Sequence, residues 1–306
     1  MKNQNKKTKS LVQQSDILIR PDGEVVVSFL FEDLGLVARE NSRDFVTAPG
    51  IPQFSIFADV SQEYESCRLC PKKCGFNRKI HAHPRCGTHQ LRLASSGISL
   101  GDESIIRGSR GSGTMMLSGC PLQCPHCHNP EMVASGEEIS IEDFVETMFS
   151  LAEQGAHNVQ ILSPTVHFPK LRLALQMAKA AGFPVPVLFK SSGYELVEEL
   201  EKFSGLVDIY LPDFKFGSCS AWAVRARAQD YFSVARNAIA EMLRQTGPMK
   251  RNTEGVLTSG TFVRHVLAPL PSTERAEIYQ YLHSLPGDVG VSILDNFQIL
   301  SATVYK

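Results

Sequence analysis

Hydrophobic residues from about position 113 onward gather in short runs, and the segments between these runs repeat their apolar residues with a helical period. Each run has the length of a β-strand, whereas each intervening segment is long enough for an α-helix. Regular alternation of this kind predicts a parallel sheet whose strands are joined by right-handed helical crossovers. The six predicted strands are residues 114–119, 158–164, 185–190, 206–215, 260–267 and 290–297.

The intervening segments carry start and stop signals of helices. In the segment 140–155, Ser140 is a good N-cap with Asp143 three residues later, and Gly155 follows the last turn. The apolar residues that share one face of this helix are Ile141, Phe144, Val145, Met148 and Ala152. Further helices are predicted over 170–182, 195–205, 220–246 with a break near Gln229 and Asp230, and 272–285.

The first 110 residues lack this alternation. Residues 1–15 are polar and are expected to fray, and residues 16–60 contain one clear strand candidate at 24–31. Residues 61–110 read as loop and hold four cysteines. The pattern therefore divides the chain into an N-terminal extension of unknown role at 1–60, a four-cysteine metal-binding module at 61–110 and a core α/β domain at 111–306.

Composition and charge exclude several classes of protein. A chain of 306 residues with 43% apolar residues can bury a substantial core. The net charge of -1 shows no basic excess, so no nucleic-acid partner is expected. No apolar run reaches the roughly 18 residues of a membrane span, and the basic N-terminus is not followed by the apolar run of a secretory signal. We expect a cytoplasmic protein without a membrane partner.

Polar residues follow or close the predicted strands, where a parallel sheet binds its ligands. The second predicted strand ends at 163–165, the third at 190–193 and the fourth at 213–215, and the fifth contains Arg264 and His265. The sheet could close partly as a barrel or stay open. In either arrangement these residues are expected to converge on one active site.

The first predicted strand runs into a loop with three cysteines, Cys120, Cys124 and Cys127, spaced C-x3-C-x2-C. Thiolates are ligands for zinc and for iron–sulfur clusters. In a [4Fe–4S] cluster three thiolates hold three irons and leave the fourth iron an open position, which is the mark of a reactive centre. The alternative is a zinc site completed by His126 or His128.

A second group of cysteines, Cys67, Cys70, Cys74 and Cys86, has the spacing C-x2-C-x3-C-x11-C. Four thiolates fill the coordination of one zinc ion or of a whole cluster. A structural centre that fastens the module to the core and a redox-active auxiliary cluster both remain open, and buried free cysteines are the metal-free alternative. Cys219 stands alone and is expected in the core.

The three-cysteine loop after the first strand of a βα domain resembles the radical S-adenosylmethionine superfamily. Within it, "CPLQCPHCHNP" is most similar to the pyruvate formate-lyase activating enzymes. The stretches "GSGTMMLSGC", "SSGYE", "VDIYLPDFK" and "FVRHVLAP" resemble an activase-like branch of that group, over about residues 64–300. The resemblance implies a partial (β/α)6 radical S-adenosylmethionine barrel with a small N-terminal cysteine-rich module.

The resemblance also implies a reaction and its cofactors. A [4Fe–4S] cluster with three cysteine ligands would bind S-adenosylmethionine at its open iron and cleave it reductively, and the 5′-deoxyadenosyl radical would abstract a hydrogen atom. The implied substrate is a glycyl radical enzyme, and a flavodoxin or ferredoxin is the implied electron donor. A peptide, nucleoside or small metabolite is the alternative substrate, and a zinc-stapled binding protein without enzymatic activity is the alternative class.

Site residues follow from the resemblance one by one. Cys120, Cys124 and Cys127 match the cluster ligands, and Asp213 and Lys215 match an Asp-x-Lys that contacts S-adenosylmethionine. His265, and Ser192 with Gly193, match positions near the cofactor, and Ser163 and Thr165 stand where the family holds the methionine amino group. In the absence of such a role, Asp213 and Lys215 could form an ion pair at a strand end, His265 could be a core histidine, and Ser163 and Thr165 could cap the following helix.

Two positions depart from the family pattern. Many members have Gly-Gly-Glu at the end of the second strand to hold the methionine amino group, whereas residues 163–165 here are Ser-Pro-Thr and supply no carboxylate. Hydroxyl groups would bind an ammonium group more weakly than a charged carboxylate would. His126 stands where an aromatic residue usually precedes the third cysteine, and it brings a titratable ring.

Overall fold

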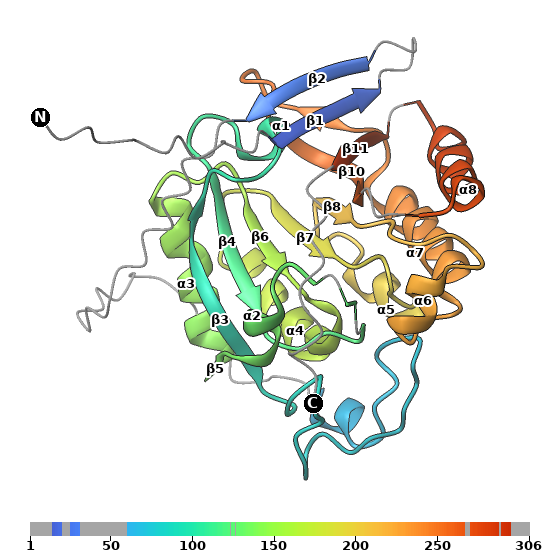
Figure 1. The fold of residues 1–306 in the computed structure, drawn as a ribbon. Helices are drawn as coiled ribbons and strands as arrows, with labels where there is room; N and C mark the ends of the chain where they lie inside the picture. The colour runs from blue at the N-terminus through green and yellow to red at the C-terminus, as the bar shows by residue number, and fades with distance from the viewer. Residues whose placement is uncertain are drawn as a thin grey trace, which may run out of the picture.

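The computed structural model describes residues 14–19, 25–30, 60–122, 124–125, 127–266, 270–287 and 289–294. It has an α/β fold built on one mixed sheet (Figure 1). The strands follow the order β2-β1-β11-β10-β8-β7-β6-β4-β3-β5, with β9 (Lys250–Arg251) paired to β10 outside this path. His126 lies outside the described residues, so the structure does not test its proposed roles.

Six neighbouring strands at the centre of the sheet are parallel, and they confirm the alternation predicted from the sequence. Each is joined to the next through at least one helix, as a right-handed βαβ connection requires. The strands are β4 (Ser112–Leu117), β6 (Val159–Leu162), β7 (Val187–Ser191), β8 (Ile209–Pro212), β10 (Leu257–Val266) and β11 (Gly290–Leu294).

Antiparallel strands extend the sheet at both ends. β3 (Leu91–Ser99) pairs with β4, and β5 (Glu137–Ile139) pairs with β3. β1 (Gln14–Ile19) pairs with β11, and β2 (Val25–Leu30) confirms the predicted strand at 24–31. The prediction that all of 61–110 is loop was wrong, because the serines and glycine of "LRLASSGIS" lower the apparent strand propensity of β3.

The helices connect the parallel strands at nearly the predicted places. α3 (Ile141–Glu153) begins after Ser140, whose hydroxyl accepts a hydrogen bond from the Asp143 amide at 3.0 Å, as its N-cap role requires. The predicted break in the long helical zone separates α6 from α7. The remaining helices are α1 (Ser104–Arg107), α2 (Pro130–Ala134), α4 (Phe168–Ala180), α5 (Val197–Leu200), α6 (Ala221–Arg225), α7 (Tyr231–Thr246) and α8 (Ser272–His283). Short 3-10 turns cover Val60–Tyr64, Thr165–His167 and Glu201–Phe203.

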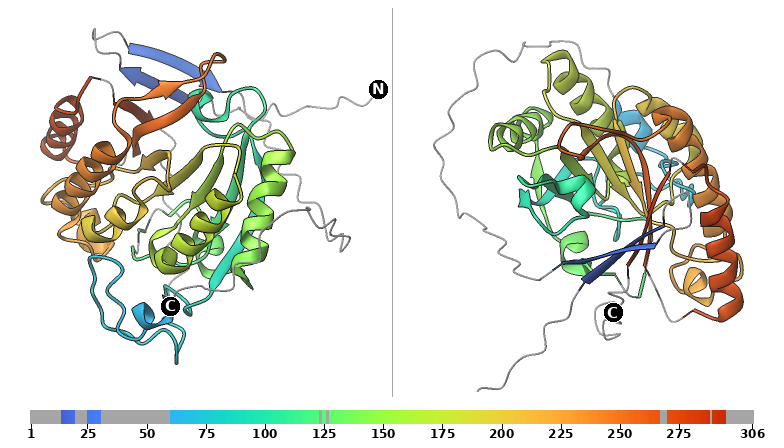
Figure 2. Two further views of the ribbon diagram at one scale, coloured as in Figure 1. Left: turned by 180° about the vertical axis from the view of Figure 1, so that it is seen from behind. Right: turned by 90° about the horizontal axis from the view of Figure 1, so that it is seen from above.

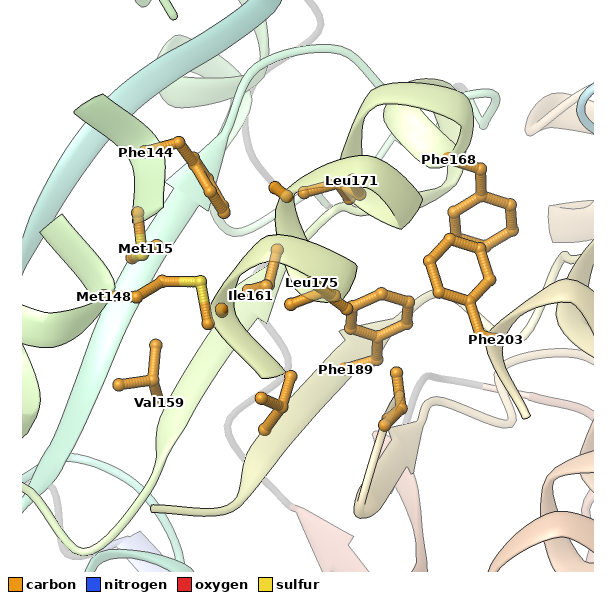
Figure 3. Packing of buried hydrophobic residues seen from close by; sticks show 14 of the residues in the cluster. Met115, Phe144, Met148, Val159, Ile161, Phe168, Leu171, Leu175, Phe189 and Phe203 are labelled. Atoms are coloured by element: carbon orange, nitrogen blue, oxygen red, sulfur yellow. The ribbon is translucent and has the colours of Figure 1, made fainter. Parts of the chain in front are cut away.

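One large hydrophobic core lies between the central strands and the helices α3 and α4 (Figure 3). In that core Phe168 packs against Phe189 and Phe203, and these rings join α4, β7 and the turn after α5. A separate hydrophobic cluster contains Ile106 of α1, Leu188 of β7 and residues of β8 and β10. Figures 1 and 2 show α3 and α4 beside one half of the sheet and α7 and α8 beside the other half.

Within the described part of the chain, no helix is long and apolar enough to cross a membrane.

Candidate functional site

A buried carboxylate occupies the end of β7, at a position that the sequence analysis did not single out. Glu195 is 1% exposed, and its two oxygens accept hydrogen bonds from the Thr165 hydroxyl at 2.9 Å and from the Ser191 hydroxyl at 3.0 Å. Thr165, which follows β6, therefore contacts a residue that follows the neighbouring strand β7. Neither Ser163 nor Thr165 caps α4 with its side chain, so the capping alternative was wrong.

The environment of Glu195 makes its ionisation unfavourable. Burial raises its pKa to about 7, although the hydroxyls of Thr165 and Ser191 act in the opposite direction. The nearby carboxylate of Asp213 also raises the pKa of Glu195. A cation placed beside Glu195 would restore its negative charge at neutral pH. In the sequence, the one indication that Glu195 belongs to the site is its position just after the polar end of a predicted strand.

Asp213 and Lys215 form an ion pair at the end of β8, as one of the alternatives predicted. Burial acts to raise the pKa of Asp213, but the cations of Lys215 and Arg264 outweigh it and lower that pKa. Burial likewise opposes the charge of Lys215, yet Asp213 and Cys124 raise the pKa of Lys215. Both groups are therefore held in their charged forms directly beside the three-cysteine loop.

Two further features hold the ends of β7 and β8 together. The Tyr231 hydroxyl donates to the carbonyl oxygen of Asp213 at 2.7 Å, lies 2.8 Å from that of Ser192, and accepts a hydrogen bond from the Lys215 amide at 3.0 Å. Gly193 has a φ of +73°, and a Cβ atom there would lie 2.3 Å from the carbonyl oxygen of Asp213. A side chain at position 193 would force the strand ends apart.

The three-cysteine loop begins immediately after β4. Burial raises the pKa of the Cys120 thiol to about 11 and that of the Cys124 thiol to about 12, and the cation of Lys215 counteracts both shifts. A negative charge on Cys127 raises both pKa values, so the three thiols lie within electrostatic reach of one another. The Cys127 amide also donates to the Cys124 carbonyl at 3.2 Å, which forms a turn between these two cysteines.

A buried histidine fixes the start of this loop and was also missed. His167 is fully buried in the 3-10 turn after β6, and its Nε2 lies 2.7 Å from the carbonyl oxygen of Ser118. Burial lowers the pKa of His167 to about 3, so the ring is neutral and its Nε2–H donates this bond. The end of β6 is thereby attached to the residues that lead into Cys120.

Several polar atoms around this layer have no hydrogen-bond partner among the described residues. They include the buried Nε2 of His265. His265 is fully buried, as a core histidine would be, and its Nδ1 lies 2.6 Å from the Phe214 carbonyl oxygen. Ser163 adopts a φ of +56°, a strained conformation for a residue with a side chain. Unpartnered polar atoms and backbone strain are both typical of ligand sites.

The four cysteines of the module line one cavity of about 280 Å³, together with Pro121 of the three-cysteine loop. Arg78 holds the module in place, because its guanidinium donates to the carbonyl oxygens of Val166 at 2.7 Å and of Cys86 at 2.8 Å. Across the described ranges, no three Cys, His, Asp or Glu side chains lie close enough together to hold a single metal ion. Cys219, which was expected in the core, is exposed.

Comparison with known proteins gives one distant relationship. No protein-family model matches the chain. The chain is 23% identical over 214 residues to "Uncharacterized protein MJ0674" of Methanocaldococcus jannaschii. That alignment covers 67% of this chain and 58% of the archaeal protein, so the chain spans less than two thirds of its relative.

Proposed function

We propose that this protein is a radical S-adenosylmethionine enzyme whose site lies at the carboxyl ends of the parallel strands. The observation that carries the proposal is the position of the three-cysteine loop. Cys120, Cys124 and Cys127 lie within electrostatic reach of one another and of Lys215, beside a layer that also holds Glu195. Six parallel strands with helices along one face are what a partial (β/α)6 barrel would require.

Side chains of matching donor type are available for a cluster and for a bound S-adenosylmethionine. Cys120, Cys124 and Cys127 would hold a [4Fe–4S] cluster, which supplies an open iron and one electron for cleavage of the sulfonium bond. His265 offers a buried ring nitrogen that lacks a partner among the described residues. A polar, cationic ligand in this layer would satisfy it.

A group of matching chemistry is available for each charged part of the ligand. Glu195 provides the carboxylate that residues 163–165 lack, and its partly protonated state would convert to a full negative charge beside an ammonium group. Lys215 provides a cation for a carboxylate or for the cluster thiolates, and Asp213 orients it. The hydroxyl of Tyr231 holds the backbone at the ends of β7 and β8 together, and productive positioning of a ligand requires such rigidity.

The substrate proposed is a glycine Cα–H of a partner glycyl radical enzyme, because the loop "CPLQCPHCHNP" resembles the activating enzymes. A flavodoxin or ferredoxin is the proposed electron donor. Hydrogen abstraction from a peptide, nucleoside or small metabolite uses the same residues and is the alternative.

Electron paramagnetic resonance of the anaerobically purified, reduced protein tests the proposal. We expect a [4Fe–4S]⁺ signal whose shape changes when S-adenosylmethionine is added, and loss of that change in the Cys124→Ala variant. Release of 5′-deoxyadenosine with a chemical reductant is the second readout. A cluster signal indifferent to S-adenosylmethionine, or a protein that holds only zinc, would refute the proposal.

A further inference from the structure

Lys190 of β7 lies on the face of the sheet that is opposite to the large core. Its neighbour Phe189 packs against Phe168 of α4 within that core, and successive side chains of a strand point to opposite faces. Leu188 accordingly belongs to the separate hydrophobic cluster that contains Ile106 of α1. Lys190, two residues after Leu188, therefore stands on the same face as Leu188 and nearer the carboxyl end of the strand.

Arg264 of β10 stands on this face as well. Phe262, two residues earlier in β10, belongs to the same hydrophobic cluster as Ile106. Strand β8 lies between β7 and β10, and Asp213 follows β8 with its carboxylate 3.9 Å from the Nε of Arg264. Lys190 and Arg264 therefore come from the strands on either side of the strand that ends at Asp213.

Two consecutive carboxylates bring these two cations together. The Asp102 carboxylate accepts a hydrogen bond from Lys190 at 2.6 Å, and the Glu103 carboxylate lies 3.1 Å from the Nε of Arg264. The Cα atoms of consecutive residues are about 3.8 Å apart. Both cations are thus fixed to one point of the segment that leads into α1, although a strand separates β7 from β10.

The cations of these two ion pairs are more exposed than the carboxylates. The side chains of Lys190 and Arg264 are 22% and 14% exposed, whereas those of Asp102 and Glu103 are 5% and 6% exposed. Gln160 of β6 also donates a hydrogen bond to Asp102 at 2.5 Å. Because the carboxylates are covered, the accessible surface that the two pairs present is mainly cationic.

A ligand can reach this surface from the carboxyl ends of the strands. Leu188 and Phe262 precede the two cations along their strands, and both are buried in the hydrophobic cluster with Ile106. That cluster fills the space towards the amino ends of the strands. The charge of Lys190 also lowers the pKa of Asp213, so Lys190 lies within electrostatic reach of the site described above.

We propose that Lys190 and Arg264 bind an anionic group of the substrate, either a carboxylate or a phosphate. An ammonium group and a guanidinium group form strong, charge-assisted hydrogen bonds with both of these anions. Asp102 and Glu103 are positioning residues, because they hold the cations in place and stay covered. The assignment of the anion to the substrate rests on the proposed function, whereas the binding of an anion does not.

The anionic group has two sources within the proposed reaction. It belongs to a small acid or phosphate ester, or to an acidic side chain on a partner protein. Lys215 remains available for the carboxylate of S-adenosylmethionine, because its charge acts on the thiols of Cys120 and Cys124. The substrate anion and the cofactor therefore use different cations.

Calorimetric titration of the cluster-loaded, full-length chain at low ionic strength tests the anion site. The probes are succinate, inorganic phosphate and a Gly-Asp-Gly peptide with blocked ends, which together distinguish the sources of the anion. We expect at least one probe to bind, and its affinity to fall at least about tenfold in two double variants. These are Asp102→Asn with Lys190→Met and Glu103→Gln with Arg264→Gln. Each removes a whole ion pair and so leaves no uncompensated buried charge.

The matched control is Lys73→Gln with Glu198→Gln, which removes an exposed ion pair and should bind the probes as wild type does. Circular dichroism verifies that all three variants fold. Absence of binding for every probe, or equal affinities in wild type and both buried-pair variants, would overturn the inference.

The change in the paramagnetic resonance signal on addition of S-adenosylmethionine is recorded for the same samples. Weaker anion binding with an unchanged response to S-adenosylmethionine supports a separate substrate site. Unchanged anion binding with a lost response would show that Lys190 and Arg264 serve the cofactor, and would overturn the inference. A wild type that binds the anion through this pair but does not respond to S-adenosylmethionine would refute the proposed function and leave the anion site standing.

Discussion

The hydroxyl of Thr165 donates a hydrogen bond of 2.9 Å to the carboxylate of Glu195 and so joins the polar ends of β6 and β7. Glu195 is almost fully buried, and it accepts hydrogen bonds from the hydroxyl groups of Thr165 and Ser191. A carboxylate in such surroundings destabilises the folded state when it ionises. Its presence suits a site that receives a cation.

Glu195→Gln should separate stability from ligand binding. The folded-state pKa of Glu195 is raised to about 7 from 4.5, so the unfolded chain releases its proton first and wild-type stability falls as pH rises through that window. Glutamine has no such proton to lose. Without cluster or ligand, we expect the variant to be more stable than wild type at pH 8 by on the order of 1–3 kcal/mol. Urea unfolding measures this difference.

The same variant should bind S-adenosylmethionine more weakly by about 10- to 100-fold, because a charge-assisted hydrogen bond becomes a neutral one. Calorimetry of the cluster-loaded protein measures this affinity. Glu199→Gln is the control, since Glu199 is also buried but pairs with Lys202 at 2.9 Å. Unchanged affinity in Glu195→Gln would remove Glu195 from the binding site.

His167→Gln should change how the free energy of unfolding depends on pH under acidic conditions. The pKa of His167 is lowered to about 3 in the folded state from the ordinary 6.5, so the unfolded chain binds the extra proton first as pH falls. The stability that the neutral ring contributes is complete above pH 6.5 and is lost towards pH 3. We expect wild type to lose on the order of a few kcal/mol over this range through His167.

Glutamine keeps a donor for the Ser118 carbonyl and does not titrate, so the variant should show a shallower loss of stability between pH 6.5 and pH 4. Thermal unfolding across that range measures the difference. His283→Gln, on the exposed surface of α8, serves as the control and should follow wild type. Parallel curves for wild type and His167→Gln would show that this histidine does not titrate with unfolding.

The regular part of the fold was predictable because strand and helix differ in the period of their apolar residues. The six parallel strands and the break before Tyr231 follow from that period alone. Glu195 could not be assigned, because its contact with Thr165 depends on which strand ends are neighbours. β3 was missed for a local reason, since its small polar residues imitate a loop. Both features depend on strand pairing and burial, which involve residues distant in sequence and are not visible in a local pattern.

Asp102→Asn should destabilise the interior of the sheet. Asp102 is 5% exposed and accepts hydrogen bonds from Lys190 at 2.6 Å and from Gln160 at 2.5 Å. Burial acts to raise its pKa, but Lys190 outweighs this and the pKa is lowered to about 2. Removal of the charge leaves Lys190 without its counter-ion, at a cost of about 3–5 kcal/mol.

The Asp102→Asn, Lys190→Met double variant should recover much of that loss, because no uncompensated charge remains. Urea unfolding of the two variants measures both effects. Lys73→Gln breaks the exposed pair with Glu198 and should cost less than about 1 kcal/mol, which makes it the surface control. A single Asp102→Asn variant as stable as wild type would show that Lys190 finds another partner.

Gly193→Ala should disturb the site through the backbone. The new Cβ would lie 2.3 Å from the Asp213 carbonyl oxygen, and the φ of +73° is itself unfavourable for alanine. We expect a loss of about 1–3 kcal/mol in unfolding free energy from the backbone strain, together with weaker binding of S-adenosylmethionine as Asp213 moves. Gly97→Ala is the control, because no atom lies within 4 Å of its new Cβ and Gly97 is not among the glycines with a positive φ. Equal stability and affinity in the two variants would show that the ends of β7 and β8 can separate without consequence for the site.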